Sequence, residues 1–288
     1  MNIPTLSPGM SVEQLVNWLN THVSGVFEFI SVYLETFLAK VETLLLLPPP
    51  LLFIVVMALI SWRTSGLVMG IFSALGLGFC LLMNLWDATI STLALIIVAT
   101  SISLIIGFPL GVLSALNRVA DHITRPIMDL MQTMPPWVYL VPAVILFSLG
   151  KTPAAMATAI FSIPPALRLT NLGIRQVSAE TVEVGKAFGG NRLQILIKIQ
   201  IPMAIPTIMM GVNQCIMLSL SMAVLAGLIG AGGLGSEIVR ALSRMNIGLG
   251  VRSGLCIVVL AIILDRMLQG IVRLTSKQAD AATAAANN

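Results

Sequence analysis

Charged side chains are scarce in this sequence: aspartate, glutamate, lysine and arginine make up 10% of the 288 residues, whereas 57% are hydrophobic. Soluble domains carry about a quarter charged residues. A chain with so few charges cannot cover its folded surface with polar groups, so we expect lipid to surround it. The apolar runs are continuous rather than alternating, which disfavours a β-barrel and predicts a polytopic α-helical membrane protein.

Residues that build metal and catalytic sites are also few. The three cysteines, Cys80, Cys215 and Cys256, each lie within an apolar run, which is typical of small buried side chains. The two histidines, His22 and His122, are far apart and have no neighbours at metal-ligand spacing. We therefore expect no metal site, and no His cluster, carboxylate pair or Ser/His/Asp set predicts a membrane-embedded enzyme.

A nucleotide-binding loop is absent as well. No G-x-x-x-x-G-K-[ST] sequence occurs, and the glycine-rich stretch GLIGAGGLGSE at 227–237 lacks the lysine and the serine or threonine that follows it. The chain is therefore not expected to bind ATP itself.

Apolar runs long enough to cross a bilayer recur along the chain, since a spanning helix needs about twenty apolar residues. Seven stretches qualify: 44–62, 66–86, 88–116, 126–150, 153–172, 203–227 and 251–270. Pro135-Pro136 lies near the middle of the fourth stretch, where the helix should kink or open. Pro164-Pro165 interrupts the fifth and leaves its boundary soft.

The two ends of the chain differ from these apolar runs. Residues 1–43 lack the basic and apolar regions of a cleavable signal peptide. They repeat apolar residues at helical spacing, with glutamates between them, which predicts amphipathic helices on the exterior membrane surface. Residues 273–288 contain the low-complexity run QADAATAAANN and are expected to form a disordered cytoplasmic tail.

The distribution of lysine and arginine predicts the orientation. Seven spans place the ends on opposite sides, and cytoplasmic loops are enriched in basic residues. If residues 173–202 are cytoplasmic, most of the 16 lysines and arginines lie inside. The N-terminus is then outside and the C-terminus in the cytoplasm, with Arg240, Arg244 and Arg252 as a local exception.

A compact polar segment, 173–202, separates the fifth and sixth runs. Ser178 is placed to cap a short helix, with Glu180 and Glu183 near its positive end. Gly189-Gly190 should end that helix in a left-handed conformation. The simplest interpretation is a solvated connector.

A connector, however, needs neither a glycine stop nor the second amphipathic stretch LQILIKIQ that runs on to Pro202. The additional structure predicts docking to a cytoplasmic partner.

The spacing of this segment resembles the EAA…G…I-x-L-P loop of ABC importer permeases. The matching residues are Glu183-Val184-Gly185, then Gly189, then Ile199-x-Ile201-Pro202. Val184-Gly185 stands where the family often has two alanines, and Ile201 where it often has leucine. In that family the short helix is the coupling helix, which inserts into a groove on the cytoplasmic ATPase and transmits its motion.

The resemblance extends over about residues 45–275, to permeases of the glycine betaine, proline betaine and choline group of quaternary-amine importers. It is carried by PIMDLMQTMPPWVYLVPAVILFSLG, IPPALRLTNLGI, PTIMMGVNQCIMLSLSMAVLAGLIGAGGLG and VVLAIILDRMLQ.

The resemblance implies an all-α, type I ABC importer (MetI-like) permease fold in a bacterial inner membrane. Two accessory transmembrane helices at 44–87 would precede a five-helix core at 88–272. It also implies a second permease copy, two cytoplasmic ATPase subunits that hold ATP and Mg, and an external substrate-binding protein. The chain itself would form the passage for a quaternary-amine osmolyte, with no catalytic residue and no cofactor of its own.

Three groups of residues are assigned on this basis. The group expected to couple to the ATPase comprises Glu180, Glu183, Val184, Gly185, Lys186, Phe188, Gly189 and Arg192. The group expected in the passage or gate comprises Asp129, Pro135, Pro136, Trp137, Tyr139, Asn213 and Gln214. The group expected at an exterior gate or binding-protein contact comprises Gly230, Gly232, Gly233, Gly235 and Arg240.

Structural interpretations stand beside these assignments. Asp129 follows Arg125 by four residues, so the two can pair on one helix face instead of gating. The rings of Trp137 and Tyr139 can contact a trimethylammonium group or simply pack. Asn213 and Gln214 can bond between helices or line the passage.

The glycine stretch can likewise be a flexible turn beside the gate or a tight re-entrant turn that allows close packing. Asp265, beside Arg266, is expected to be an interfacial anchor at the end of the last span.

A different functional class would be an ion-coupled secondary carrier or channel for small cationic or zwitterionic solutes. Such a protein needs coupling-ion groups in mid-membrane. Asp129 and Asp265 are the available carboxylates, and both are expected near the cytoplasmic edge, so the importer subunit is the preferred hypothesis.

Overall fold

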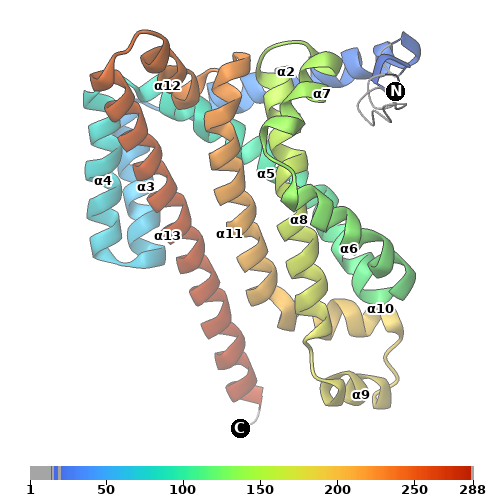
Figure 1. Ribbon diagram of the computed structural model, residues 1–288. Helices are drawn as coiled ribbons and strands as arrows, with labels where there is room; N and C mark the ends of the chain where they lie inside the picture. The colour runs from blue at the N-terminus through green and yellow to red at the C-terminus, as the bar shows by residue number, and fades with distance from the viewer. Residues whose placement is uncertain (1–13, 15, 19–20, 287–288) are drawn as a thin grey trace.

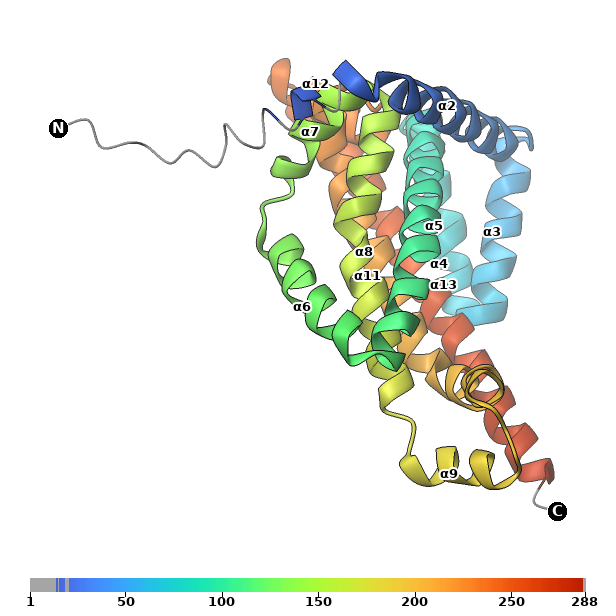
Figure 2. The ribbon, with the colours of Figure 1, turned by 90° about the vertical axis from the view of Figure 1, so that its right-hand side faces the viewer.

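The computed structural model of the chain describes residues 14, 16–18 and 21–286, with side chains up to Val272. Every regular element within these residues is a helix, which confirms the predicted all-α class. Figures 1 and 2 show a bundle of long helices with one helix, α2 (Ser24–Leu46), lying across one end of it. The short helix α9 (Ala179–Ala187) lies at the opposite end. We call these the α2 end and the α9 end.

Three long helices form the centre of the bundle: α5 (Trp86–Leu116), α8 (Lys151–Arg175) and α11 (Ile201–Ala226). Helix α5 approaches α8 closely because two glycines of α5 face it. A Cβ on Gly107 would lie 2.6 Å from Cβ of Ala166, and one on Gly111 would lie 2.6 Å from Cβ of Thr170. Small residues of this kind let helices pack in a membrane without a hydrophobic driving force between them.

Buried hydroxyl groups also join the three central helices. The Oγ atoms of Ser103 on α5 and Ser162 on α8 are 2.7 Å apart. Ser219 Oγ on α11 donates to Ser162 Oγ at 3.2 Å, and Thr100 Oγ1 donates to Ser219 Oγ at 3.1 Å. In an apolar surrounding each hydroxyl needs such a partner, so this cluster fixes the register of the three helices.

Helices α3 (Pro50–Ser65), α4 (Leu67–Leu82) and α13 (Ile247–Ala286) pack together beside the centre. Cys80 and Cys256 are buried in this part, and Cys215 is buried on α11, as their apolar surroundings in the sequence predict. Helix α13 includes residues 273–286, which were expected to be disordered; alanine has the highest helix propensity, and this stretch is rich in it.

The remaining helices connect the bundle: α6 (Arg118–Thr133), α7 (Trp137–Phe147), α10 (Arg192–Ile195) and α12 (Gly233–Ser243). Two short helical turns, η1 (Leu196–Gln200) and η2 (Gly227–Ile229), flank α11.

Length and hydropathy identify three segments that can cross a membrane within the described part of the chain: Trp86–Leu116, Arg192–Ile229 and Ile247–Val272. Two bent helix pairs raise this number to five if each pair is one span. The predicted total of seven spans, and the division of the chain at residues 43, 87 and 272, stay predictions.

Prolines move two of the predicted span boundaries. Helix α2 ends at Leu46 and α3 begins at Pro50, with a 90° bend between them. Residues 44–46 therefore belong to α2, which lies across the end of the bundle, and not to the predicted first span. The predicted span 126–150 is two helices, α6 and α7, bent by 99°. The break lies at Pro135-Pro136, as predicted.

Candidate coupling site and polar cavity

Helix α9 begins and ends as the sequence predicts. Ser178 Oγ accepts a hydrogen bond from the Thr181 backbone N–H at 3.3 Å, which caps the first turn. At the other end Gly189 has φ of +76°, and its N–H donates to the Lys186 carbonyl at 2.9 Å. Glycine takes this backbone conformation without steric cost, so the chain reverses here and returns toward the bundle.

The returning segment supports α9 from the side. Asn191 and Gln194 form a reciprocal cap for α10, with N–O distances of 2.8 and 2.9 Å. The π-helical turn η1 then leads into α11, which has Pro202 in its first turn. Gly185 of α9 faces this turn, because a Cβ there would lie 2.5 Å from Cδ1 of Ile199. The absent side chain lets α9 rest directly on η1.

The outer surface of this hairpin exposes large apolar side chains. Phe188 is 89% exposed and Val184 is 56% exposed. A groove of about 520 Å³ lies between α9 and η1, and both residues line it. Of the eight residues expected to couple to the ATPase, seven are exposed; the eighth, Gly185, is buried against η1. An exposed aromatic ring beside a groove is typical of an interaction surface.

The glycine-rich turn at 227–237 lies at the α2 end, opposite α9, as Figure 1 shows for α12. Its geometry supports close packing rather than flexibility. A Cβ on Gly233 would lie 2.5 Å from Oγ1 of Thr92, and one on Gly235 would lie 2.5 Å from the Ala223 carbonyl oxygen. Thr92 Oγ1 also accepts a hydrogen bond from the Leu234 N–H at 2.8 Å.

Arg240, from the same predicted group, pairs with Glu237 on its own helix at 2.9 Å. The other two glycines of the group, Gly230 and Gly232, have φ of +81° and +80°. They therefore shape the turn through the backbone.

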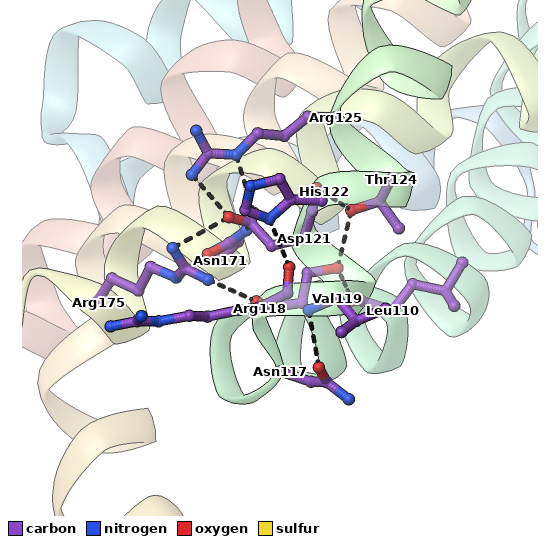
Figure 3. A network of polar contacts seen from close by, with 11 residues as sticks. Leu110, Asn117, Arg118, Val119, Asp121, His122, Thr124, Arg125, Asn171 and Arg175 are labelled. Carbon is purple, nitrogen blue, oxygen red and sulfur yellow. Dashed lines mark hydrogen bonds and ion pairs between the residues drawn. The ribbon is translucent and has the colours of Figure 1, made fainter.

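At the α9 end, a buried carboxylate that was not predicted from the sequence joins α6 to α8 (Figure 3). The side chain of Asp121, on α6, is 5% exposed. It accepts from Arg125 Nε at 3.0 Å and from Asn171 Nδ2 at 2.7 Å, and it pairs with Arg175 Nη1 at 3.1 Å. Arg175 Nη2 also donates to the Ser114 carbonyl at 2.8 Å, which adds the end of α5.

This cluster, which we call the Asp121 network, consists of Asp121, Arg125, Asn171, Arg175 and Ser114. Arg175 is the last residue of α8 and stands three residues before Ser178, the cap of α9. The network therefore ties the end of α8, just before α9, to α6 by charge-assisted hydrogen bonds, the stronger kind.

The predicted pairing of Arg125 with Asp129 is wrong. Arg125 also follows Asp121 by four residues, and it pairs with that carboxylate at 2.8 Å. Asp129 instead forms an ion pair with Arg168 of α8. Between α6 and α8 lies a cavity of about 390 Å³, which both members of the Asp129–Arg168 pair line.

The break between α6 and α7 is held by Tyr139. Pro135 has no N–H, so it cannot donate to the carbonyl of Met131 four residues earlier. The Tyr139 hydroxyl donates to that carbonyl at 2.5 Å, and its ring packs edge-on against Phe161 with centroids 5.6 Å apart. Trp137 is 52% exposed and has no ring partner among the described residues. Tyr139 thus braces the bend.

We expect Tyr139→Phe to lower the free energy of unfolding by about 1–2 kcal/mol, because the Met131 carbonyl loses its hydrogen bond in a half-buried place. The matched control is Tyr33→Phe: Tyr33 is the other tyrosine of the chain, is 63% exposed and keeps its ring contact with Phe29. Thermal unfolding of the two purified variants makes the comparison. Equal melting temperatures would show that the hydroxyl does not brace the bend.

Of the two polar residues of α11 in the predicted passage group, Asn213 has the first predicted role, a bond between helices, and the passage role of Gln214 stays a prediction. Asn213 Nδ2 donates to Asp265 Oδ1 of α13 at 2.9 Å, and Gln269 Nε2 donates to both oxygens of Asp265 at 2.8 Å. Asn213 therefore bonds between helices, whereas Gln214 is exposed. Asp265 joins α11 to α13, and Arg266 Nε lies 4.0 Å from it.

Comparison with known proteins adds to this geometry. The sequence profile of the family described as binding-protein-dependent transport system inner membrane component matches residues 107–277. The chain is 43% identical over 262 residues to the glycine betaine/proline betaine transport system permease protein ProW of Escherichia coli (strain K12), covering 91% of this chain and 74% of ProW. It is 38% identical over 269 residues to the glycine betaine transport system permease protein OpuAB of Bacillus subtilis (strain 168), covering 93% and 95%.

Among solved structures, an inward-facing crystal form of the MetNI methionine ABC transporter contains a similar chain. The TM-score is 0.60 at 21% identity, over 64% of this chain and 93% of the other. At this identity the likeness shows a shared fold.

Proposed function

Because the chain belongs to the family of binding-protein-dependent transport system inner membrane components, we propose that it forms the passage of an ATP-driven importer for quaternary-amine osmolytes. Glycine betaine is the first candidate substrate, with proline betaine and choline beside it. The match to the family profile and the similarity to two permease proteins confirm the family that the loop at 173–202 indicated. The ion-coupled carrier considered from the sequence is not favoured.

The observation that carries the substrate proposal is the extent of similarity to permeases named for glycine betaine. Identities of 43% and 38% extend over 91% and 93% of this chain. A similarity that covers nearly the whole chain includes the helices of the passage as well as the coupling segment.

The proposed assembly has two copies of this permease, two cytoplasmic ATPase subunits that bind ATP and Mg, and an external binding protein. The α9 hairpin is the proposed contact with the ATPase, since it exposes Phe188 and Val184 beside a groove. The α9 end then faces the cytoplasm together with the C-terminus, and the α2 end faces outside. In this orientation the glycine-rich turn and Arg240 lie on the side of the binding protein.

The chain's own residues suggest how motion passes from α9 into the passage. A displacement of α9 pulls first on Ser178 and the end of α8. Arg175 at that end is bonded to Asp121 of α6, so α6 follows α8. Helix α6 ends at the braced bend before α7, where a change of angle alters the passage. The Asp121 network is thus the proposed mechanical link between the ATPase contact and the broken helix.

The test is ATP-dependent uptake of labelled glycine betaine by proteoliposomes that contain the permease, its ATPase and its binding protein. We expect Gly189→Pro to abolish uptake and the stimulation of ATP hydrolysis, because proline fixes φ near −65° and removes the N–H that bonds Lys186. The chain should remain inserted in the membrane.

A closely matched control exists at the end of α3. Gly66 also has positive φ, at +94°, with open space around its missing Cβ, and its N–H donates to Trp62 at 2.9 Å. Gly66→Pro should lower the free energy of unfolding but leave the ratio of uptake to ATP hydrolysis unchanged. Normal uptake by Gly189→Pro would refute the coupling role, and gradient-driven uptake by the permease alone would favour a secondary carrier.

A further inference from the structure

The cavity between α6 and α8 is lined by charged side chains of both signs, and α6 is amphipathic. Helix α6 exposes an apolar stripe of Val119, Ile123, Ile127 and Leu130, at intervals of three and four residues. Asp121, Arg125 and Asp129 lie on the opposite face, toward α8. The apolar stripe can face lipid, so the polar face is turned away from the acyl chains.

The hydrogen-bonding capacity of the cavity is incompletely used. Three guanidinium groups line it, those of Arg125, Arg168 and Arg175, and each has five N–H donors in a fixed geometry. Arg168 is bonded to Asp129 through one nitrogen, Nη2. Donors suited to a carboxylate therefore remain available in the cavity.

One amide in the lining of the cavity is also incompletely hydrogen-bonded. Asn171 lines the cavity and is 8% exposed. Its Nδ2 donates to Asp121, but its buried Oδ1 has no hydrogen-bond partner among the described residues. A buried unpaired oxygen is costly. The exposed carboxylate of Asp129 provides the negative side of the cavity.

The Asp129–Arg168 ion pair is the part of the cavity lining that can separate. Its side chains are 67% and 49% exposed, and exposed ion pairs contribute little to stability. Asp121, in contrast, is buried and accepts from three partners, so it stays in place. A ligand that carries one positive and one negative charge can replace each partner of the exposed pair without leaving an unpaired charge.

We propose that this cavity is a transient binding site for a small zwitterion, a quaternary ammonium carboxylate, on its way through the passage. The ligand's carboxylate binds Arg168 and the free donors beside it, and its ammonium group faces the Asp129 carboxylate. A simple anion would meet the exposed carboxylate of Asp129, and a simple cation would meet three arginines. The inference rests on the proposed function for the source of its ligand.

The test uses a thiol reporter in the full-length permease, reconstituted in lipid nanodiscs. Leu172 lines the cavity and is 44% exposed, whereas the three native cysteines are 0% exposed. In Leu172→Cys the introduced thiol is therefore the accessible one for a sulfonate methanethiosulfonate reagent. At glycine betaine concentrations about ten times its dissociation constant, occupancy should slow modification about tenfold.

Matched probes and variants isolate the chemistry. Tetramethylammonium and acetate, each with one of the two charges, should protect far less than glycine betaine. Arg168→Gln in the Leu172→Cys background should abolish protection. Arg63→Gln, which removes an exposed arginine in the last turn of α3 outside the cavity, should leave it intact.

Equal protection by tetramethylammonium, or protection that survives Arg168→Gln, would overturn the proposal. So would a modification rate that responds to the lipid headgroup composition of the nanodisc but not to glycine betaine. ATP-driven uptake by the whole complex is measured separately. If the complex imports glycine betaine but glycine betaine does not protect the thiol at position 172, the cavity site is rejected and the proposed function stands. If the thiol is protected but the complex imports no glycine betaine, the proposed function is rejected and the cavity site stands.

Discussion

Replacing Asp121 by alanine should lower the free energy of unfolding by roughly 2–4 kcal/mol, near the range for breaking a buried ion pair. The carboxylate is 5% exposed and is the common acceptor of Arg125, Arg175 and Asn171. Its loss leaves the buried amide of Asn171 without a partner and two guanidinium groups without their counterion. Arg125 is 65% exposed and can be hydrated, which is why we expect less than the full penalty.

The effect on transport should exceed the effect on folding. Arg175 would keep its bond to the Ser114 carbonyl, but the end of α8 would no longer be tied to α6. We therefore expect protein that still folds at low temperature to hydrolyse ATP with its partners while importing little substrate. Thermal unfolding and the ratio of uptake to hydrolysis measure the two consequences separately.

Asp87→Ala is the matched control. Asp87 is an exposed aspartate in the first turn of α5, at the other end of that helix from Ser114, with no ion pair among the described residues. Its loss should cost about 0.3–1 kcal/mol through the helix dipole, with coupling unchanged. If Asp121→Ala has the same melting temperature as Asp87→Ala and a normal ratio of uptake to ATP hydrolysis, the network is neither a structural nor a mechanical link.

The Asp121 network also shows where sequence reasoning succeeds and where it stops. The spacing of four residues that paired Arg125 with Asp129 pairs it equally well with Asp121. The apolar stripe from Val119 to Leu130 was a usable signal, because it places Asp121 on the opposite, buried face of α6. Its partners Asn171 and Arg175 lie about fifty residues away, and no local pattern connects them to α6.

Local signals were sufficient where the physics is local. A serine that caps α9 and a glycine that ends it act within one helical turn, so both were predicted and both are present. Prolines likewise fixed the break between α6 and α7. The bend angle, and the Tyr139 hydroxyl that stabilises it, depend on how α7 packs on α8, and the sequence of the break alone does not contain that contact.

The other large effect is expected at the α9 hairpin. Phe188→Ala should leave the fold of the permease unchanged, because the ring is 89% exposed. In the complex we expect the ring to be a buried anchor in the ATPase, and loss of such an anchor costs about 2–4 kcal/mol of binding. That corresponds to a decrease in affinity of about 30-fold to nearly 1,000-fold.

Binding of the purified ATPase to the permease in nanodiscs measures this loss directly, and stimulation of ATP hydrolysis should fall with it. Leu242→Ala is the control, since Leu242 is 76% exposed on α12 at the opposite end of the bundle. It removes a similar exposed apolar side chain and should not change ATPase affinity. Retained affinity in Phe188→Ala, or an equal loss in Leu242→Ala, would show that the ATPase does not bind the α9 hairpin. The ATPase could then not displace α9, and no motion would pass through Arg175 to Asp121.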